Sequence, residues 1–320
     1  MTTGQLTPWV IGADLGQVVL FLIGAPLLVG LMRSIRCRME GRIGPPVTQP
    51  WKDLRKLVAK QRTQPVQSTI FFASAPVVLV ASTIVAVWLT PLLSTQVSLV
   101  GGSDLFAVVF LLLLGSVSMS LAALDTATAF GGMGSSRLMT IVALAEPALL
   151  VAILALAAPL HSSSLSSIVV ASLHHPVWLA TPQRLLSFGA FVIVILAESG
   201  RLPVDNPATH LELTMIHEAL ILEYSGPDLA LVNLGENLRL TFMLALLSNL
   251  FFPWGIATGT GGWSLPIALV SLIGKVAVLG ALVSVGEVGV AKLRLFRVPE
   301  LMAGAFMLSI LAVLSALVIA

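Results

Sequence analysis

Residues 105–124 read LFAVVFLLLLGSVSMSLAAL, twenty consecutive positions without a charged side chain. An α-helix needs about 20 apolar residues to cross the hydrocarbon core of a bilayer. Uncharged or nearly uncharged runs of this size recur along the chain and make eight in all. The other seven are Leu15–Met32, Phe71–Val97, Leu138–Leu160, Val177–Ala197, Leu229–Trp254, Ser264–Gly286 and Leu301–Ala320. We therefore predict an all-α, polytopic integral membrane protein in which residues 1–320 form a single transmembrane domain of about eight helices.

The composition excludes a soluble globule and gives no sign of a redox centre. The chain is 57% hydrophobic and 10% charged, with a mean hydropathy of +1.00, which leaves too little polar surface to cover a globule of this size. Cys37 is the single cysteine, whereas iron–sulfur clusters need several thiolates, and no Cys/His spacing suits zinc or haem. We predict no catalytic residue, metal or cofactor in this chain, and no nucleic-acid partner. Any electron transfer then belongs to partner subunits.

Basic residues predict the orientation of the spans. Nine of the seventeen Lys and Arg residues lie between Arg33 and Arg62, in the loop after the first span. The loops at the opposite ends of the spans, roughly 99–105, 161–182 and 255–263, contain none. Because basic loops stay in the cytoplasm, both termini are expected on the outer side of the inner (cytoplasmic) membrane. The first span has no basic start and no small-residue cleavage site, so we expect it to be retained.

The basic loop, residues 33–69, combines charge with a restricted backbone. Gly44, Pro45, Pro46 and Pro50 prevent a helix through its middle, while Trp51–Lys60 can form a short basic amphipathic helix. Two interpretations remain open. The loop sets the topology and contacts anionic lipid, or it is a docking surface for a soluble partner.

The acidic loop, residues 198–228, carries six of the fifteen acidic residues. Carboxylates are costly near hydrocarbon, so their clustering in a membrane protein indicates proton handling. Pro207 suits a helix start, and His210–Tyr224 contains no helix breaker. On one helix, Glu212 and Glu223 would lie within about 20° of each other, with His210 and His217 on another face. The loop is therefore predicted to contain an amphipathic helix with a carboxylate face and an imidazole face.

Ionisable residues also occur within the spans. Glu146 follows Arg137 by nine positions, which places it about 13 Å into the membrane. Lys275 lies about 16 Å deep in the seventh span, where we expect a carboxylate partner on another helix. Asp125 falls near the end of the third span, and Glu287 is too far along the helix to pair with Lys275.

Three motifs resemble a known family. The first is Arg42-Ile43-Gly44-Pro45 with Gln49, Pro50, Asp53 and Lys56; the second is Gly134-Ser135-Ser136-Arg137 with Glu146-Pro147; and the third is Glu198, Arg201, Pro203, Asp205, Pro207 and Glu212 with Glu223-Tyr224-Ser225-Gly226. They resemble the H-type membrane subunit of respiratory NADH–quinone oxidoreductase (complex I) and its relatives, the membrane subunits of energy-converting (group 4) nickel–iron hydrogenases of the formate hydrogenlyase subunit 4 type.

The resemblance implies a non-catalytic membrane anchor. Its partners would be the hydrogenase large and small (iron–sulfur) subunits, which hold the nickel–iron centre and the iron–sulfur clusters, together with antiporter-like membrane subunits and the bilayer. Only residues 46–48 separate the Gly-Pro from the Gln-Pro pair, and Ala208 and His210 stand where the complex I subunit commonly has acids, so the hydrogenase branch is favoured. The complex I subunit itself, with a quinone site, is the alternative. A stand-alone ion transporter is a second alternative, although no internal repeat is evident and only Gly131–Gly134 could break a helix.

These arguments give two sets of candidate residues. The expected proton path comprises Asp125, Glu146, Glu198, Asp205, Glu212, Glu218, Glu223 and Lys275. The expected structural or docking residues are Arg42, Gly44, Pro45, Gln49, Pro50, Asp53, Lys56, Arg137, Arg201, His210 and His217. Redox turnover in docked subunits would move protons from the acidic loop to Glu198, then to Glu146, and on to the antiporter-like partners.

Overall fold

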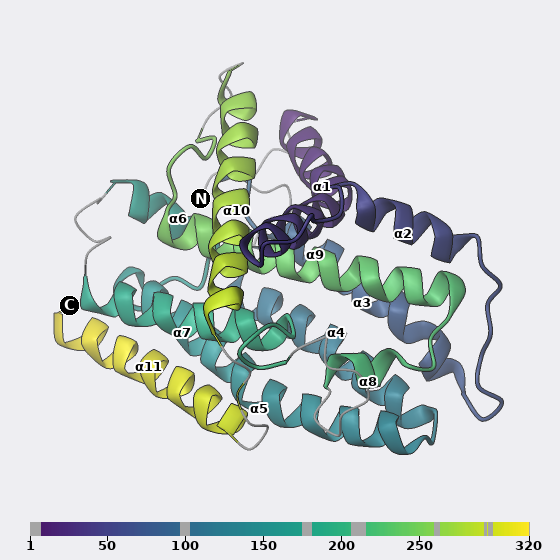
Figure 1. The fold of residues 1–320 in the computed structure, drawn as a ribbon. Coiled ribbons are helices and arrows are strands. Elements are labelled where there is room, and N and C mark those ends of the chain that lie inside the picture. Colours follow the sequence, from purple (N-terminus) through teal and green to yellow (C-terminus); the bar gives the residue numbers. More distant parts are fainter. Residues whose placement is uncertain are drawn as a thin grey trace.

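The computed structural model describes residues 8–96, 103–174, 181–205, 216–258, 263–290, 293 and 297–319, and these residues are almost entirely helical (Figure 1). Seven helices within these ranges are long and apolar enough to cross a membrane. They are α1 (Pro8–Met39), α3 (Ile70–Leu89), α4 (Leu105–Asp125), α5 (Ala129–Ala157), α9 (Gly226–Phe251), α10 (Ser264–Gly289) and α11 (Val298–Ile319). The helix α7 (Pro182–Glu198) occupies the place of the remaining predicted span and has 17 residues, the lower limit for a crossing. The prediction of an all-α polytopic membrane protein is confirmed.

Several helix ends differ from the predicted runs. The helix α3 ends at Leu89 and not at Val97, because Thr90 adopts an extended conformation and Pro91 follows. The helix α5 starts nine residues before the predicted Leu138, since the Thr128 hydroxyl accepts a hydrogen bond from the Gly131 N–H group. The glycines at 131–134 are therefore helical and do not break a helix. A short helix, α6 (Leu165–His174), lies in a loop for which we predicted no structure.

One of the two predicted amphipathic helices has the predicted length, shifted by two residues, and the other is shorter. The helix α2 (Gln49–Val58) confirms the expected helix in the basic loop. In the acidic loop only α8 (His217–Ile221) is helical among the described residues, and the Tyr224 N–H group closes a turn on the Ile221 carbonyl. The prediction that one helix continues to Tyr224 is wrong at this end, so Glu223 lies in a turn. His210 and Glu212 fall outside the described residues.

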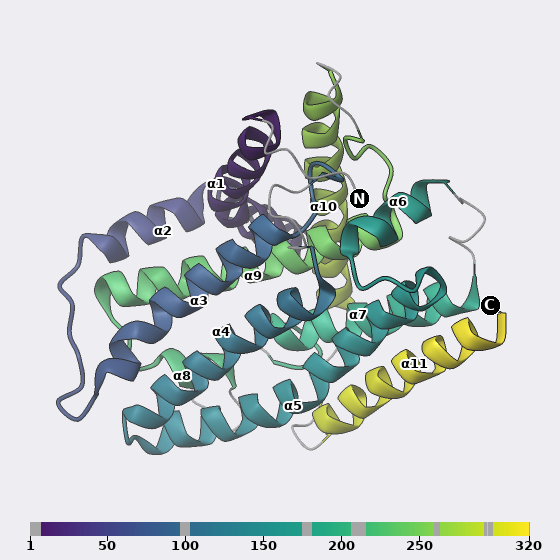
Figure 2. The ribbon, with the colours of Figure 1, turned by 180° about the vertical axis from the view of Figure 1, so that it is seen from behind.

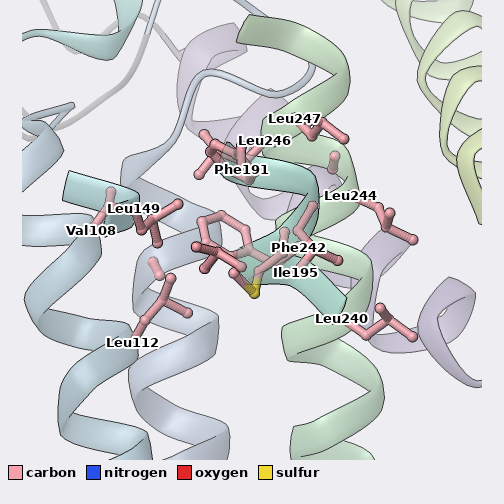
Figure 3. Close-up of a cluster of buried hydrophobic side chains, with 14 of the residues drawn as sticks. Val108, Leu112, Leu149, Phe191, Ile195, Leu240, Phe242, Leu244, Leu246 and Leu247 are labelled. Carbon is pink, nitrogen blue, oxygen red and sulfur yellow. The ribbon is translucent and has the colours of Figure 1, made fainter. Parts of the chain in front are cut away.

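The helix α9 lies at the centre of the bundle and is packed by α1, α3, α7 and α10. Large side chains such as Phe242 on α9 and Phe191 on α7 are fully buried against Leu149 of α5 (Figure 3). Because lipid tails are as apolar as these side chains, close packing stabilises this core more than removal from water does. Behind it, α3, α4 and α5 lie side by side, and α11 runs along α5 and α7 (Figure 2).

At each end of the bundle, hydrogen bonds or ion pairs connect segments that are far apart in the sequence. At the end that carries residues 33–69, here called the basic-loop end, Arg62 pairs with Asp228 at the start of α9. At the opposite end, here called the far end, the Thr95 N–H group donates to the Ala257 carbonyl. Alternation of helices thus brings the basic and acidic loops to the same end.

Candidate functional site

Two carboxylates and one guanidinium meet inside the bundle. Glu146 comes from α5, Glu198 from the last residue of α7, and Arg239 from α9, and all three side chains are buried. Arg239 Nη2 lies 3.3 Å from Glu146 Oε1 and also donates to Glu198 Oε2. We call these three residues the triad. The structure thus brings together two predicted proton-path acids through an arginine that the sequence analysis did not select.

The charges of the triad do not balance if both acids are ionised. In the described part of the chain, Glu146 Oε2, Glu198 Oε1 and Arg239 Nε have no hydrogen-bond partner. A buried charge is costly unless it is paired and hydrogen-bonded, and one guanidinium compensates only one carboxylate. One proton shared by the two acids removes the excess negative charge. The triad therefore has the composition of a site that stores one exchangeable proton.

A cavity of about 320 Å³ extends from Glu198 and Arg239 of the triad to Asp205 and α8 in the acidic loop. Its walls come from α1, α2, α8, α9, the residues that follow α7, and the end of α10. Its ionisable lining residues include Glu198, Asp205, His217, Glu218, Glu236 and Arg239. Three further arginines line it, namely Arg33, Arg36 and Arg201. Such a lining can hold water and pass protons between neighbouring groups.

Asp205 fixes the start of α8. Its Oδ2 accepts the N–H groups of Ile216 at 3.1 Å and His217 at 3.2 Å, and His217 Nδ1 lies 3.6 Å from the same oxygen. Burial favours the neutral carboxyl, but the His217 side chain and these N–H groups outweigh it and hold the pKa of Asp205 below its usual value.

The same surroundings act on the imidazole in the opposite direction. Burial favours the neutral ring of His217, yet Asp205, Glu236 and Glu198 outweigh this effect and raise the pKa of the imidazole above its usual value. Gly200, at a φ of +57°, makes room for this ring, because a Cβ atom there would lie 2.6 Å from His217 Nδ1.

A chain of ion pairs begins at three residues that line the cavity, Arg36, Arg201 and Glu287. Glu287 at the end of α10 lies 2.8 Å from Arg201 Nη1 and 3.7 Å from Arg36 Nη1. Arg36 also pairs with Glu40, which in turn lies 3.8 Å from Arg42. Arg201 was predicted as a docking residue, but its side chain is only 18% exposed and holds α10 to the residues after α7. Arg42, by contrast, is exposed.

Four of the described predicted proton-path residues do not line this cavity: Glu146 is linked to it only through Arg239, and the other three lie elsewhere. Asp125 accepts the N–H groups of Thr69 and Phe72 and so caps α3. Glu223 is exposed in its turn. Lys275 donates to Asn249 Oδ1 at 2.7 Å and to the Phe252 carbonyl at 3.1 Å, at the far end. The expected carboxylate partner of Lys275 is therefore wrong, because an amide and a helix-terminal carbonyl satisfy its ammonium group.

The predicted docking residues of the basic loop form an ordered segment. Asp53 accepts a hydrogen bond from Gln49 at 2.8 Å, and Pro50 is buried in the first turn of α2. Gly44 and Pro45 are half-buried, and a Cβ atom at Gly44 would lie 3.0 Å from Cys37 Cβ. Lys56 is exposed, and Arg137 on α5 is half-buried and engaged with other groups. In the described ranges, no group of three His, Cys, Asp or Glu residues is placed to hold a metal ion.

Arg239 and Glu236 were missed because their run, Leu229–Trp254, was treated as a span with few charges. Residues three apart are neighbours on a helix surface, so this Glu-x-x-Arg pattern places two opposite charges side by side within a membrane helix. An ionisable pair at that depth is itself a signal of a functional site.

Comparison with known proteins identifies the class. The model of the NADH dehydrogenase family matches residues 14–319, and the chain belongs to this family. It is a multi-pass membrane subunit of the kind found in hydrogenase and complex I-like assemblies, which confirms the resemblance read from the motifs.

Individual relatives point to the hydrogenase side of the family. The chain is 33% identical to hydrogenase-4 component C of Escherichia coli (strain K12), covering 93% of each chain, and 31% identical to formate hydrogenlyase subunit 4 of the same organism, covering 94% of this chain and 96% of the relative. The H-type NADH-quinone oxidoreductase subunit of Anaplasma phagocytophilum (strain HZ) is 28% identical over 77% of this chain and 74% of its own.

A solved structure shares the fold. A chain of the membrane-bound sulfane sulfur reductase, an archaeal respiratory membrane complex, superposes with a TM-score of 0.78 over 96% of this chain and 99% of its own, at 21% identity. At this identity the likeness concerns the arrangement of helices alone.

Proposed function

We propose that this chain anchors the soluble subunits of a formate hydrogenlyase-type complex at the cytoplasmic membrane and carries protons from its cavity into the bundle. The observation that supports this most is the triad, in which Glu146 and Glu198 share Arg239, and Glu198 and Arg239 line the cavity. A site with one surplus carboxylate takes up and releases one proton at the least electrostatic cost.

The proposed route follows the cavity. Protons enter at the acidic loop, where Asp205 and Glu218 line the cavity, and reach Glu198 and then Glu146. Glu212 belongs to the loop that joins Asp205 to α8, and we retain it as an entry group. From Glu146 protons pass to antiporter-like membrane subunits. Asp125, Glu223 and Lys275 lie off this cavity, so we leave them out of the route.

Docking uses the basic-loop end. The exposed Arg42 and Lys56 present positive charge on the basic loop, and we retain His210 of the acidic loop as a docking residue. We expect the nickel–iron centre and the iron–sulfur clusters in the large and small soluble subunits seated there. A change of charge in those subunits would then act on the groups that line the cavity.

The alternative function is that of the H-type subunit in an NADH–quinone oxidoreductase, and the 28% identity to such subunits supports it. Protection of this chain by a quinone-site inhibitor against photolabelling would favour that alternative. The shorter match and the short segment between the two proline pairs of the basic loop support the hydrogenase assignment instead.

The test is Glu146→Gln in the complete complex reconstituted in vesicles. We expect the number of ions moved per hydrogen molecule turned over to fall to background, because glutamine cannot bind the proton. Dye-linked hydrogen turnover, measured in the same samples, provides the denominator. Glu300→Gln, which removes an exposed carboxylate at the start of α11, is the matched control. Unchanged ion movement in Glu146→Gln would remove the triad from the route.

A further inference from the structure

We propose that His217 is the side chain through which protons enter the cavity, and that Asp205 positions it for this exchange. The inference rests on the proposed function and names the entry group of the same route. His217 was predicted as a docking residue, but it lines the cavity together with Glu198 and Glu236.

The geometry restricts the imidazole to one place. Its backbone N–H group is held by Asp205, and its ring lies against Gly200, where any side chain would collide with it. Nδ1 is buried and makes no hydrogen bond in the described part of the chain, yet it lies 3.6 Å from Asp205 Oδ2. A shift of a few tenths of an ångström in either group closes this contact to hydrogen-bond distance.

Asp205 defines which nitrogen exchanges protons. A carboxylate beside Nδ1 favours the tautomer with its hydrogen on Nδ1, and this leaves the lone pair on Nε2. Nε2 takes one proton from a hydronium ion, which becomes water, to give an imidazolium ion paired with the Asp205 carboxylate, and then gives that proton to a water molecule on the cavity side. One proton enters and one leaves, no other bond changes, and Asp205 stays ionised throughout.

Acidic groups on several elements around the His217 ring favour its protonation. Asp205 faces it from the loop after α7, Glu198 from α7 and Glu236 from α9, and each favours the imidazolium ion. The remaining charged groups on the surrounding elements are Glu218 on α8, Asp228 and Arg239 on α9, Arg184 on α7, Arg201 in the loop after α7, Arg137 and Glu146 on α5, and Asp125 at the end of α4. The net balance is acidic, so a proton is attracted to this position before it reaches the triad.

The experiment measures ions moved per hydrogen turned over as a function of pH, with the reconstituted complex. In the wild type this ratio should fall as the pH rises through the pKa of His217, since the imidazolium ion is then lost. His217→Gln should lower the ratio to near background, because glutamine cannot bind the proton, and remove that alkaline limb. His174→Gln, at the exposed end of α6, is the matched control and should follow the wild type.

A second variant keeps the proposal testable if His217→Gln fails to assemble. Asp205→Asn retains a side-chain oxygen for the two N–H groups of α8 but removes the charge, so the alkaline limb should move to lower pH. A limb that stays in place, or a His217→Gln complex with the wild-type profile, would overturn the proposal. If Glu146→Gln abolishes ion movement while His217→Gln does not change it, only the entry group is wrong; if Glu146→Gln changes nothing, the proposed function fails as well.

Discussion

Both ends of the bundle bury polar side chains, but they satisfy them in different ways. At the far end, Gln17 donates to the Thr90 carbonyl and accepts the Leu93 N–H group, and Asn249 donates to the Leu92 carbonyl. At the basic-loop end, the carboxylates of the triad face a single arginine and keep unpartnered oxygen atoms.

The contrast distinguishes buried polar groups that stabilise the fold from buried polar groups that can exchange a proton. The far end has one ammonium group, Lys275, and its acceptors are an amide oxygen and the carbonyl that ends α9, where a cation is favoured by the helix dipole. These two acceptors of Lys275 do not bind or release protons, so this contact offers no second acidic site for proton transfer. In the triad, negative charges outnumber the positive charge, so the site is balanced only with a proton on it.

Removal of the triad cation should have the largest effect. Arg239→Gln leaves Glu146 and Glu198 buried without a counter-charge, and we expect a loss of about 3–5 kcal/mol in the free energy of unfolding. Thermal unfolding of the purified complex measures it. The double variant Glu198→Gln with Arg239→Gln removes one carboxylate as well and should recover most of the loss. Equal stability of the single and double variants would contradict the charge argument.

Loss of the far-end cation should cost less and spare the ion movement. Lys275→Met leaves Asn249 Oδ1 and the Phe252 carbonyl without this donor, so we expect a loss of about 1–3 kcal/mol. The number of ions moved per hydrogen should stay at the wild-type value. Lys60→Met, an exposed lysine of the basic loop, is the control. A changed ion ratio with intact stability would place Lys275 in the proton route after all.

The His217–Asp205 pair predicts a smaller, pH-dependent effect. The raised pKa of His217 means that its stabilising contribution is fully present below its unfolded pKa and is lost as the pH rises through its folded pKa. The difference in Tm between the wild type and His217→Gln should therefore shrink from about pH 6 towards alkaline pH. A difference that is constant across this range would show that the ring acts by packing alone.

The smallest effect is expected at an exposed ion pair. Arg42 lies 3.8 Å from Glu40 with its side chain 77% exposed, so Arg42→Ala should leave the stability almost unchanged. If the basic loop docks the soluble subunits, their retention during purification should nevertheless decrease. Full retention in Arg42→Ala, combined with a similar result for Lys56→Ala, would argue against docking at this face.

The sequence was sufficient to predict the membrane spans, because a run of about twenty apolar residues matches the length of a helix that crosses the bilayer. It also located Glu146 and Glu198, since acids within or beside a span are expensive. Their common partner, Arg239, follows only from the packing of α5, α7 and α9, which no spacing along the chain reveals.

Predictions from local sequence patterns were wrong where contacts with other parts of the chain determine a helix end or the role of a side chain. Periodicity predicted one helix from His210 to Tyr224, but Asp205 caps the chain at Ile216 and His217, and helical structure in the described part of this segment begins only there. Likewise Asp125 resembled a proton-path acid, yet its carboxylate serves the start of the neighbouring helix α3.

The contact between the end of the basic loop and the start of α9 has a mechanical consequence. Arg62 lies 2.6 Å from Asp228, Thr63 donates to Ser225, and a Cβ atom on Gly226 would lie 2.6 Å from the Gln61 carbonyl oxygen. Asp228 belongs to the first turn of the helix that bears Arg239, about 16 Å further along its axis. We therefore expect a displacement of residues 61–63 to be passed to α9, which connects this surface contact to the arginine between the two buried acids.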